Sequence, residues 1–487
     1  PFQHDYCLPH GFFLCSCRYY IARKAALSRD CGKESMGIAS IIEKLFSMPV
    51  ELCYILFVYN PERRLFMGWI KAYVTKIYRN MGQYLRWLFF SGLTGAAVGL
   101  FASLFSWCLN HATAFRTQHH YMFLTLPLGG LLIVFLYKAF HYENNGGTDS
   151  VIESIHSEII IPFRMAFLIF CSTIITIFCG GSVGREGAAL QIGGSMGKKL
   201  GDIFHFNETD KKIILMSGMA AAFSALFGTP MAAAFFAMEV SSVGIMYYAA
   251  LVPSICAALV ANDVAKYIGV QTENFHVMND LELSLVPGLK VVLLAACCAM
   301  LSILFCMMLQ MGEVFFKKYF SNLYIRICAG GILLILLTLL IGSQDYLGTG
   351  MPIIEQALAG NALPWAFLFK MIFTVITISA GYKGGEIVPS LFIGATFGCT
   401  VGALLGLPAS LGAAVGMIAV FCGVTNCPIT SVLISFELFG FDDAYYFLIA
   451  AATSYMLSGY YSLYHSQTIV YSKFENKYVN QHTSRPF

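Results

Sequence analysis

The sequence predicts an all-α, polytopic membrane protein made of two inverted-topology helical repeats that contain short broken helices. Of its 487 residues, 57% are hydrophobic and 12% are charged, whereas soluble chains carry roughly 25% charged residues. Long apolar runs such as 88–115 and 213–238 recur along the chain, and each exceeds the about 20 apolar residues that a membrane helix needs. In addition, motifs of the first half return in the second half in the same order.

The expected helices begin at about residue 85 and follow one another with short breaks. Several are too short to cross a bilayer and are interrupted by glycine or proline. Such segments at matching places of two halves indicate a transport site near the membrane midplane. The expected helices cover residues 85–113, 121–141, 163–180, 186–201, 210–226, 229–241, 244–262, 287–317, 325–343, 364–380, 388–404, 409–424, 428–440 and 444–464.

Two kinds of motif define the repeat. In both halves a proline-led helix reaches a glutamate nine residues after the proline, and a glycine-flanked glutamate lies upstream. Several elements in one order favour an internal repeat over coincidence. The paired residues are Glu186 with Glu386, Pro230 with Pro428, and Glu239 with Glu437. For Glu437 a purely structural role is the alternative.

The repeat predicts four parts of the chain. We expect a cytoplasmic, partly disordered or amphipathic segment at 1–80, a first transmembrane repeat at 81–275, a second at 276–475, and a short tail at 476–487 without a regulatory domain. Residues 1–86 hold twelve of the thirty Lys and Arg residues, and the positive-inside rule places such a segment in the cytoplasm. The alternative for this segment, a basic arm that binds RNA, is the weaker one, so no nucleic-acid partner is expected. The expected location is the plasma (inner) membrane of a prokaryote.

The sixteen cysteines indicate neither disulfides nor a metal. They are scattered, many lie inside apolar runs, and no paired CxxC motifs occur. Cysteine acts there as a small buried hydrophobic residue. We expect no metal site and no cofactor.

Glycines before apolar helices suggest a site for an anion. Moving an anion into hydrocarbon carries an idealised desolvation penalty of order 20 kcal/mol. Helix N-termini offset it through free N–H groups and a macrodipole worth about half a positive charge, and glycine lets the backbone approach the ion. Gly184, Arg185, Glu186 and Gly187 begin one such helix, and the segment 383–389 begins another. Two such ends, one from each repeat, could face a common point in the membrane.

Glu186 is the strongest functional candidate in the chain. A carboxylate within a membrane segment is costly and usually functional. Ionised, it can occupy the anion site itself; protonated, it can swing out, so that it both gates the pathway and carries a proton. The alternative is a glutamate that merely caps its own helix, and Arg185 could pair with it locally.

These segments resemble the CLC chloride channels and chloride/proton antiporters. GSVGREGAALQIGGSMG at 181–197 is similar to the family's GREGP helix start, with Ala188 in place of proline. YKGGEIVPSLFIGA at 382–395 is similar to its GKxGxxxP element, with Tyr382 in place of the leading glycine. The likeness extends over about residues 85–475 and implies an inverted-repeat protomer with its own pore, paired as a homodimer in the bilayer and carrying chloride or fluoride. It also implies that Glu186 is the gating glutamate and that the anion lies near residues of both helix starts: Gly184, Arg185, Gly187, Gly385 and Ile387.

The sequence also departs from the family pattern. The family's anion-contacting serine falls on Gly146, or on Asn145 after a shift of one residue. Its internal proton-transfer glutamate falls on Val240, one position after Glu239, so Glu239 is kept as a proton-linked candidate. The family's central tyrosine has no clean match in the segment 459–474, which contains Tyr460, Tyr461, Tyr464 and Tyr471. Of these four, Tyr464 is the predicted anion ligand.

Glu386 is the most informative departure from the family pattern. A GGE helix start, an altered serine element and a missing internal glutamate together resemble the family's fluoride/proton antiporter branch, in which a glutamate at this position takes part in proton coupling. A carboxylate near the pore also responds to a neighbouring anion, so it could couple the two fluxes. The alternative is an acid stabilised at a helix N-terminus by up to about 1 kcal/mol.

Two other classes of function are alternatives to halide transport. An intramembrane enzyme would need a nucleophile–base pair or a metal constellation, and the sequence contains no HExxH motif and no GxSxG motif with a partner. A secondary transporter for an organic anion remains open, although the narrow glycine-lined helix ends favour a small ion. The sequence therefore predicts a halide channel or a halide/proton antiporter, and not an enzyme.

Overall fold

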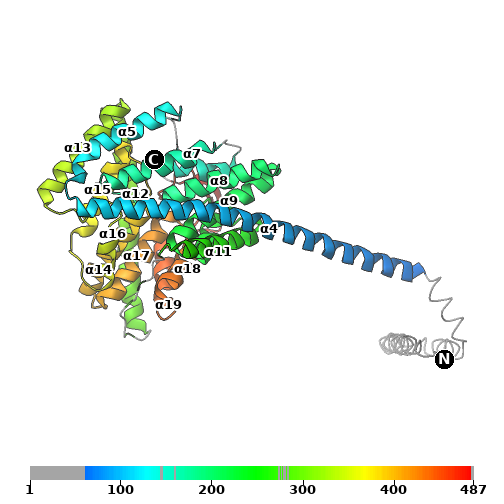
Figure 1. Cartoon of the computed structure of the whole chain (residues 1–487). Coiled ribbons are helices and arrows are strands. Elements are labelled where there is room, and N and C mark those ends of the chain that lie inside the picture. Colours follow the sequence, from blue (N-terminus) through cyan, green and yellow to red (C-terminus); the bar gives the residue numbers. More distant parts are fainter. Residues whose placement is uncertain are drawn as a thin grey trace, which may run out of the picture. The chain divides into compact units, whose positions relative to one another are not determined.

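The computed structural model describes residues 61–142, 146–157, 161–271, 275, 277, 281 and 284–483. The chain divides into two units, 1–84 and 85–487, and the second unit contains every feature discussed below. The predicted all-α membrane fold is confirmed, because helices make up nearly all regular structure in this unit (Figure 1).

The helices of the first half succeed one another in the predicted order. The first helix is longer than predicted, since it begins before residue 85. They are α4 (Pro61–Gln118), α5 (Leu126–Ala139), α6 (Thr148–His156), α7 (Arg164–Phe178), α8 (Glu186–Ile203), α9 (Glu208–Phe227), α10 (Pro230–Glu239) and α11 (Leu251–Ile268), with short 3-10 helices η2 (Met122–Thr125) and η3 (Tyr248–Ala250).

The second half repeats this series. Helices α8 and α16 have 18 residues each, and α7 and α15 have 15 each, as expected for equivalent elements. The members are α12 (Leu285–Tyr319), α13 (Leu323–Ile341), α14 (Met351–Leu358), α15 (Ala366–Ala380), α16 (Ile387–Leu404), α17 (Ala409–Thr425), α18 (Pro428–Phe439) and α19 (Ala444–Leu457).

In each half, two helices cross with glycine facing glycine. A Cβ atom added to Gly193 of α8 would lie 2.1 Å from the carbonyl oxygen of Gly218 on α9. In the second half, a Cβ atom on Gly394 of α16 would lie 2.4 Å from the carbonyl oxygen of Gly416 on α17. Small residues let helix backbones approach closely in a membrane, where no hydrophobic force drives them together. The helices of each pair, which are adjacent in Figure 1, therefore pack closely against one another.

Several long helices suit a lipid environment. Six have the length and apolar composition to cross a membrane, counted over the described residues. Their outward faces carry exposed large apolar side chains, such as Trp107 on α4 and Leu340 on α13, which is 82% exposed. Side chains like these would be unfavourable in water and are favourable against lipid.

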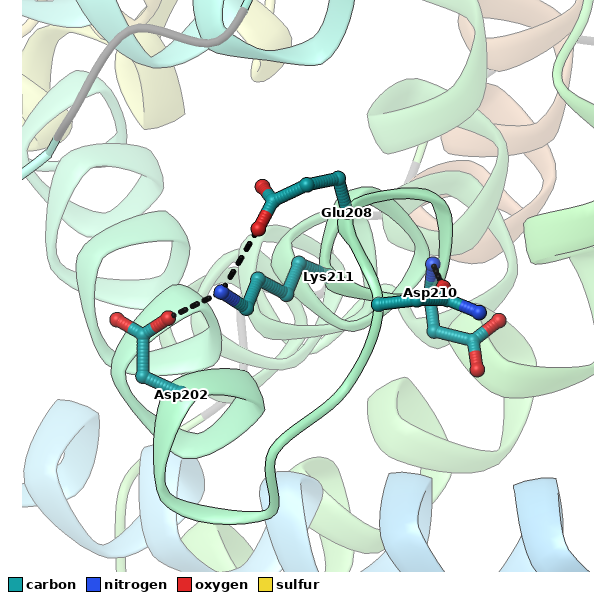
Figure 2. A network of polar contacts seen from close by, with 5 residues as sticks. Asp202, Glu208, Asp210 and Lys211 are labelled. Atoms are coloured by element: carbon teal, nitrogen blue, oxygen red, sulfur yellow. Dashed lines mark hydrogen bonds and ion pairs between the residues drawn. The ribbon is translucent and has the colours of Figure 1, made fainter.

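A polar turn joins α8 to α9 (Figure 2). The ammonium group of Lys211 lies 2.8 Å from an oxygen of Asp202 and 2.9 Å from an oxygen of Glu208, and these carboxylates raise the pKa of Lys211 to about 12. Arg86, near the start of the membrane part of α4, pairs with Asp210 at 3.0 Å. The part of α4 around Arg86 and the α8–α9 turn therefore lie at the same end of the second unit.

Three elements were not predicted. Helices α6 and α14 each follow a glycine with positive φ, at Gly147 and Gly350. The third is a small sheet in which β2 (Thr468–Tyr471) pairs in parallel with β1 (Ser242–Val243) and antiparallel with β3 (Tyr478–His482). Helix α19 ends at Leu457, before the predicted residue 464, and the chain reaches this sheet through an irregular segment that contains turns.

Candidate functional site

The N-termini of α8 and α16 meet inside the molecule. Gly184 N donates to Gly385 O at 2.7 Å, and Gly385 N donates to Gly184 O at 2.9 Å. This antiparallel bridge joins the segments that lead into the two helices. The junction of the two repeats, which the sequence predicted only as a possibility, is thus a direct backbone contact.

Glu186 occupies the first position of α8 and is fully buried. One carboxylate oxygen accepts a hydrogen bond from Arg185 N at 3.0 Å, and the other lies 3.4 Å from Arg185 Nε. The side chain of Arg185 is held in turn, since its Nη2 donates to Leu226 O at 3.1 Å. The carboxylate is therefore folded onto the N-terminus of its own helix, the place where a free anion would also be stabilised.

Gly187 allows the second repeat to approach α8. A Cβ atom at Gly187 would lie 2.9 Å from Gly385 Cα and 3.6 Å from an oxygen of Glu386. Thr148, at the start of α6, donates from its hydroxyl to Gly187 O at 3.4 Å and accepts from Gln191 Nε2 at 3.1 Å. Three helix N-termini, those of α6, α8 and α16, therefore converge with the Glu386 carboxylate close to Gly187.

A cavity of about 780 Å³ opens beside this convergence. Of the predicted site residues, Gly146, Glu386 and Tyr464 line it. Both acidic and basic side chains line it, so an anion inside would face carboxylates as well as cations. The ionisable groups on its wall, apart from tyrosines, are Asp149, Glu313, Lys317, Arg326, Lys383, Glu386 and His465.

Tyr464 is the only one of the four candidate tyrosines on the cavity wall. Its side chain is 1% exposed, and its hydroxyl has no hydrogen-bond partner among the described residues. Tyr460 instead donates to Ser472 Oγ at 2.9 Å, and Tyr471 is 44% exposed. A buried hydroxyl normally finds a partner, so this O–H group is suited to a ligand in the cavity.

Glu239 lies elsewhere. Its carboxylate accepts from Thr430 N at 2.9 Å, from the Thr430 hydroxyl at 2.6 Å and from Ile429 N at 3.2 Å. It thus caps α18, while its repeat partner Glu437 caps α10 through Met231 N and Ala232 N. Glu239 is absent from the cavity wall, and its proton-linked role stays a prediction.

The remaining predicted residues surround the junction. Gly184, Arg185, Gly187, Gly385 and Ile387 lie at the two helix starts, and Ile387 is fully buried as the first residue of α16. Asn145, the alternative to Gly146, lies outside the described residues.

Sequence reasoning missed several cavity residues. Glu313 lies near the C-terminal end of α12, where it pairs with Lys317. A carboxylate within a membrane helix is by itself a functional signal. Asp149 lies two residues after Gly147. Its Oδ1 accepts a hydrogen bond from Ser466 N at 3.0 Å. Arg326 and His465 give no such signal, because only the folded chain brings them to the cavity.

Comparison with known sequences gives one family. Residues 129–459 match the voltage gated chloride channel family. A chloride/fluoride channel protein from Pseudomonas syringae pv. tomato is 34% identical over 395 residues, which covers 80% of this chain and 87% of that protein. The H(+)/Cl(-) exchange transporter ClcA from Vibrio vulnificus is 26% identical over 396 residues, which covers 74% of this chain and 83% of that protein.

Solved structures give the same fold. The crystal structure of a CLC-type fluoride/proton antiporter aligns with a TM-score of 0.77 at 31% identity, covering 79% of this chain and 98% of that one. A slow cyanobacterial Cl-/H+ antiporter aligns with a TM-score of 0.68 at 16% identity, covering 77% of this chain and 94% of that one. The second likeness concerns the fold alone.

Proposed function

This chain belongs to the voltage gated chloride channel family, and we propose that it carries halide ions across a membrane through the junction of α8 and α16, with Glu186 as the gate. The observation that carries the proposal is the burial of Glu186 at a helix N-terminus beside the Gly184–Gly385 bridge. A carboxylate and a halide compete there for the same N–H groups and the same dipole.

The pathway follows from this competition. An anion in the cavity meets the Tyr464 hydroxyl and the N-terminal end of α6 at Gly146 before it reaches the junction. While Glu186 is ionised it fills the site and blocks passage. When Glu186 is protonated it loses its attraction to the helix end and leaves the site to the anion.

We propose further that the transported ion is fluoride and that protons move in exchange. Two relatives support this: the chloride/fluoride channel protein, at 34% identity, and the fluoride/proton antiporter, at 31% identity. Glu386 supports it chemically, since its carboxylate lies near Gly187 and also lines the cavity. A proton arriving from the cavity could pass from Glu386 toward Glu186, without a glutamate at Val240.

We also propose a setting for the protein. The named relatives come from bacteria, which supports the plasma membrane of a prokaryote with the N-terminus in the cytoplasm. The family resemblance supports a homodimer in which each protomer has its own pathway. None of these relatives is named as an enzyme, and the chain is proposed to be a transporter only.

The test is ion efflux from liposomes that contain the purified protein, with fluoride or chloride inside and external pH recorded. Fluoride efflux with matched proton uptake is expected. In Glu186→Gln the amide no longer competes as an anion, so halide should flow while proton uptake falls about tenfold or more. Glu386→Gln should also lose proton uptake, and the exposed Glu355→Gln should behave like the wild type.

Each contrary outcome has a distinct meaning. Chloride efflux without proton uptake would make the chain a chloride channel and remove the role of Glu386. Absence of any halide flux in the wild type would sink the proposal as a whole.

A further inference from the structure

A second group of positive charges lies away from the cavity. Lys370, on α15, is fully buried. Its ammonium group donates to Gly348 O at 2.7 Å and Tyr346 O at 3.2 Å, and it lies 5.3 Å from the ring centre of Phe392. None of these three contacts supplies a negatively charged partner. The buried ammonium group of Lys370 therefore has no counter-ion among them.

Arg116 reaches the same loop from α4. A Cβ atom on Gly348 would lie 2.7 Å from Arg116 Nη2 and 3.0 Å from Nη1. The Nε and Nη1 atoms of Arg116 are buried and lack a hydrogen-bond partner among the described residues. Neither Arg116 nor Lys370 makes an ion pair within that part of the chain. The fully buried Lys370 and the partly exposed Arg116 thus both contact Gly348. Buried guanidinium nitrogens without a hydrogen-bond partner are costly unless an anion joins them.

The N-terminus of α14 adds to this positive charge. Gly350 caps the helix with φ +79°, and a Cβ atom there would lie 3.5 Å from Lys370 Nζ. The free N–H groups of a helix start attract anions. The helix dipole, Lys370 and Arg116 therefore act on one small region around 348–350.

This region is connected to the segment that carries the gate. Gly348 N donates to Gly181 O at 3.2 Å. One turn beyond Lys370, the hydroxyl of Thr374 lies 3.1 Å from the hydroxyl of Ser182, and a turn later Thr377 accepts from Ser182 N at 3.2 Å. A polar stripe on α15 thus runs from Lys370 along the segment 181–185 that leads into Glu186.

We propose that Arg116, Lys370 and the N-terminus of α14 form a second halide-binding site, on the opposite side of the gate from the cavity. Helices α6 and α14 are equivalent members of two inverted repeats, so their N-termini approach the junction from opposite faces. The N-terminus of α6 lines the cavity together with Lys383. The N-terminus of α14 lies beside Lys370 and Arg116. The identity of the anion as a halide rests on the proposed function, but the binding site itself does not.

The competing explanation is structural: the two cations only hold the loop 346–350 in place. In that case their removal would lower stability and would leave halide binding and the concentration dependence of transport unchanged.

Bromide is a suitable probe, because its anomalous scattering locates it in a crystal. Bromide density is expected within hydrogen-bond distance of Arg116 Nη1 or Lys370 Nζ in the wild type. It should disappear in Lys370→Met and weaken in Arg116→Gln. The matched control is Lys290→Met, because Lys290 also donates to a loop carbonyl, Gly406 O, at 3.1 Å. In liposomes the first two variants should raise the half-saturating halide concentration several-fold, and the control should not.

Density confined to the α8–α16 junction, or unchanged in both cation variants, overturns the proposal. If Lys370→Met does not fold, Arg116→Gln carries the test, since its amide replaces a side chain that is only partly buried. Bromide beside Arg116 in a protein that moves no halide would leave this site standing and sink the transport proposal. Halide flux without bromide at this position would support the transport proposal and overturn the second binding site.

Discussion

At the scale of single residues, Lys473 closes a buried polar network beneath the last helix. Its ammonium group donates to Asn426 Oδ1 at 2.5 Å, Tyr455 O at 3.0 Å and Ser458 Oγ at 3.0 Å. Asn426 donates to Gln467 Oε1 at 2.9 Å, and Gln467 donates to Val240 O at 2.9 Å. The network thus fixes the backbone at Val240, where the family has its internal proton-transfer glutamate.

Lys473 should make stability depend on alkaline pH. Burial lowers the pKa of Lys473 from 10.5 to about 8. The unfolded chain therefore binds more protons between these values, so stability should rise from pH 8 toward pH 10.5, by at most about 1.4 kcal/mol per pH unit. Thermal unfolding of detergent-purified protein across this range, compared between wild type and Lys473→Met, measures the effect.

The variant should also be less stable near neutral pH, by about 1–3 kcal/mol, because Asn426 Oδ1 loses its donor. Lys477→Met, at an exposed position of the same hairpin, controls for general alkaline effects. An identical pH dependence in wild type and Lys473→Met would contradict the argument.

The sequence could not reveal this network. Gln467 and Val240 are 227 residues apart, and Lys473 and Asn426 are 47 apart. No local pattern marks such partners, since each residue type is ordinary at a surface turn. The same reason explains why Lys370 and Arg116 gave no signal, whereas Glu186 and Glu386 stood out as acids at glycine-rich helix starts.

At the scale of helices, the two repeats exchange caps. Glu239 at the end of α10 accepts from the N-terminus of α18, and Glu437 near the end of α18 accepts from the N-terminus of α10. A carboxylate at a helix N-terminus stabilises it by about 0.3–2 kcal/mol, more when partly buried. Each repeat therefore stabilises a helix N-terminus of the other repeat.

This exchange gives a matched pair of variants. Glu239→Gln and Glu437→Gln should each lower the free energy of unfolding by about 1–2 kcal/mol, because the neutral amide keeps an acceptor but loses the charge. Neither should alter the number of protons exchanged per halide in the liposome assay. A change of proton stoichiometry in Glu239→Gln alone would instead establish the proton-linked role predicted for Glu239.

Most helices could be predicted, because apolar runs and glycine or proline breaks mark them directly. The confirmed all-α fold rests on these long signals. Helices α6 and α14 were missed because they are short, with 9 and 8 residues, and each directly follows a glycine that reads as a loop signal. The strands of the small sheet were missed because β1 has two residues and pairs with a segment at the other end of the chain.

At the scale of the whole molecule, the inverted repeat places equivalent turns on opposite faces. Arg86 contacts Asp210 beside the α8–α9 turn, whereas Arg116, about 45 Å farther along α4, contacts Gly348. Helix α12 has 35 residues; its Glu313 lines the cavity, and Lys290 near its start meets Gly406 in the α16–α17 turn. The α8–α9 turn and the α16–α17 turn should therefore lie on opposite sides of the membrane.

Added cysteines can test this arrangement in intact cells with a membrane-impermeant maleimide. Thr209 and Ala403 are exposed positions beside the two turns. With the N-terminus in the cytoplasm, Ala403→Cys should gain label in intact cells, and Thr209→Cys should gain it only after permeabilisation. The unsubstituted protein gives the background from native cysteines. Equal labelling of both positions in intact cells would contradict the inverted arrangement, while labelling of Thr209→Cys alone would keep the inversion and reverse the proposed orientation in the membrane.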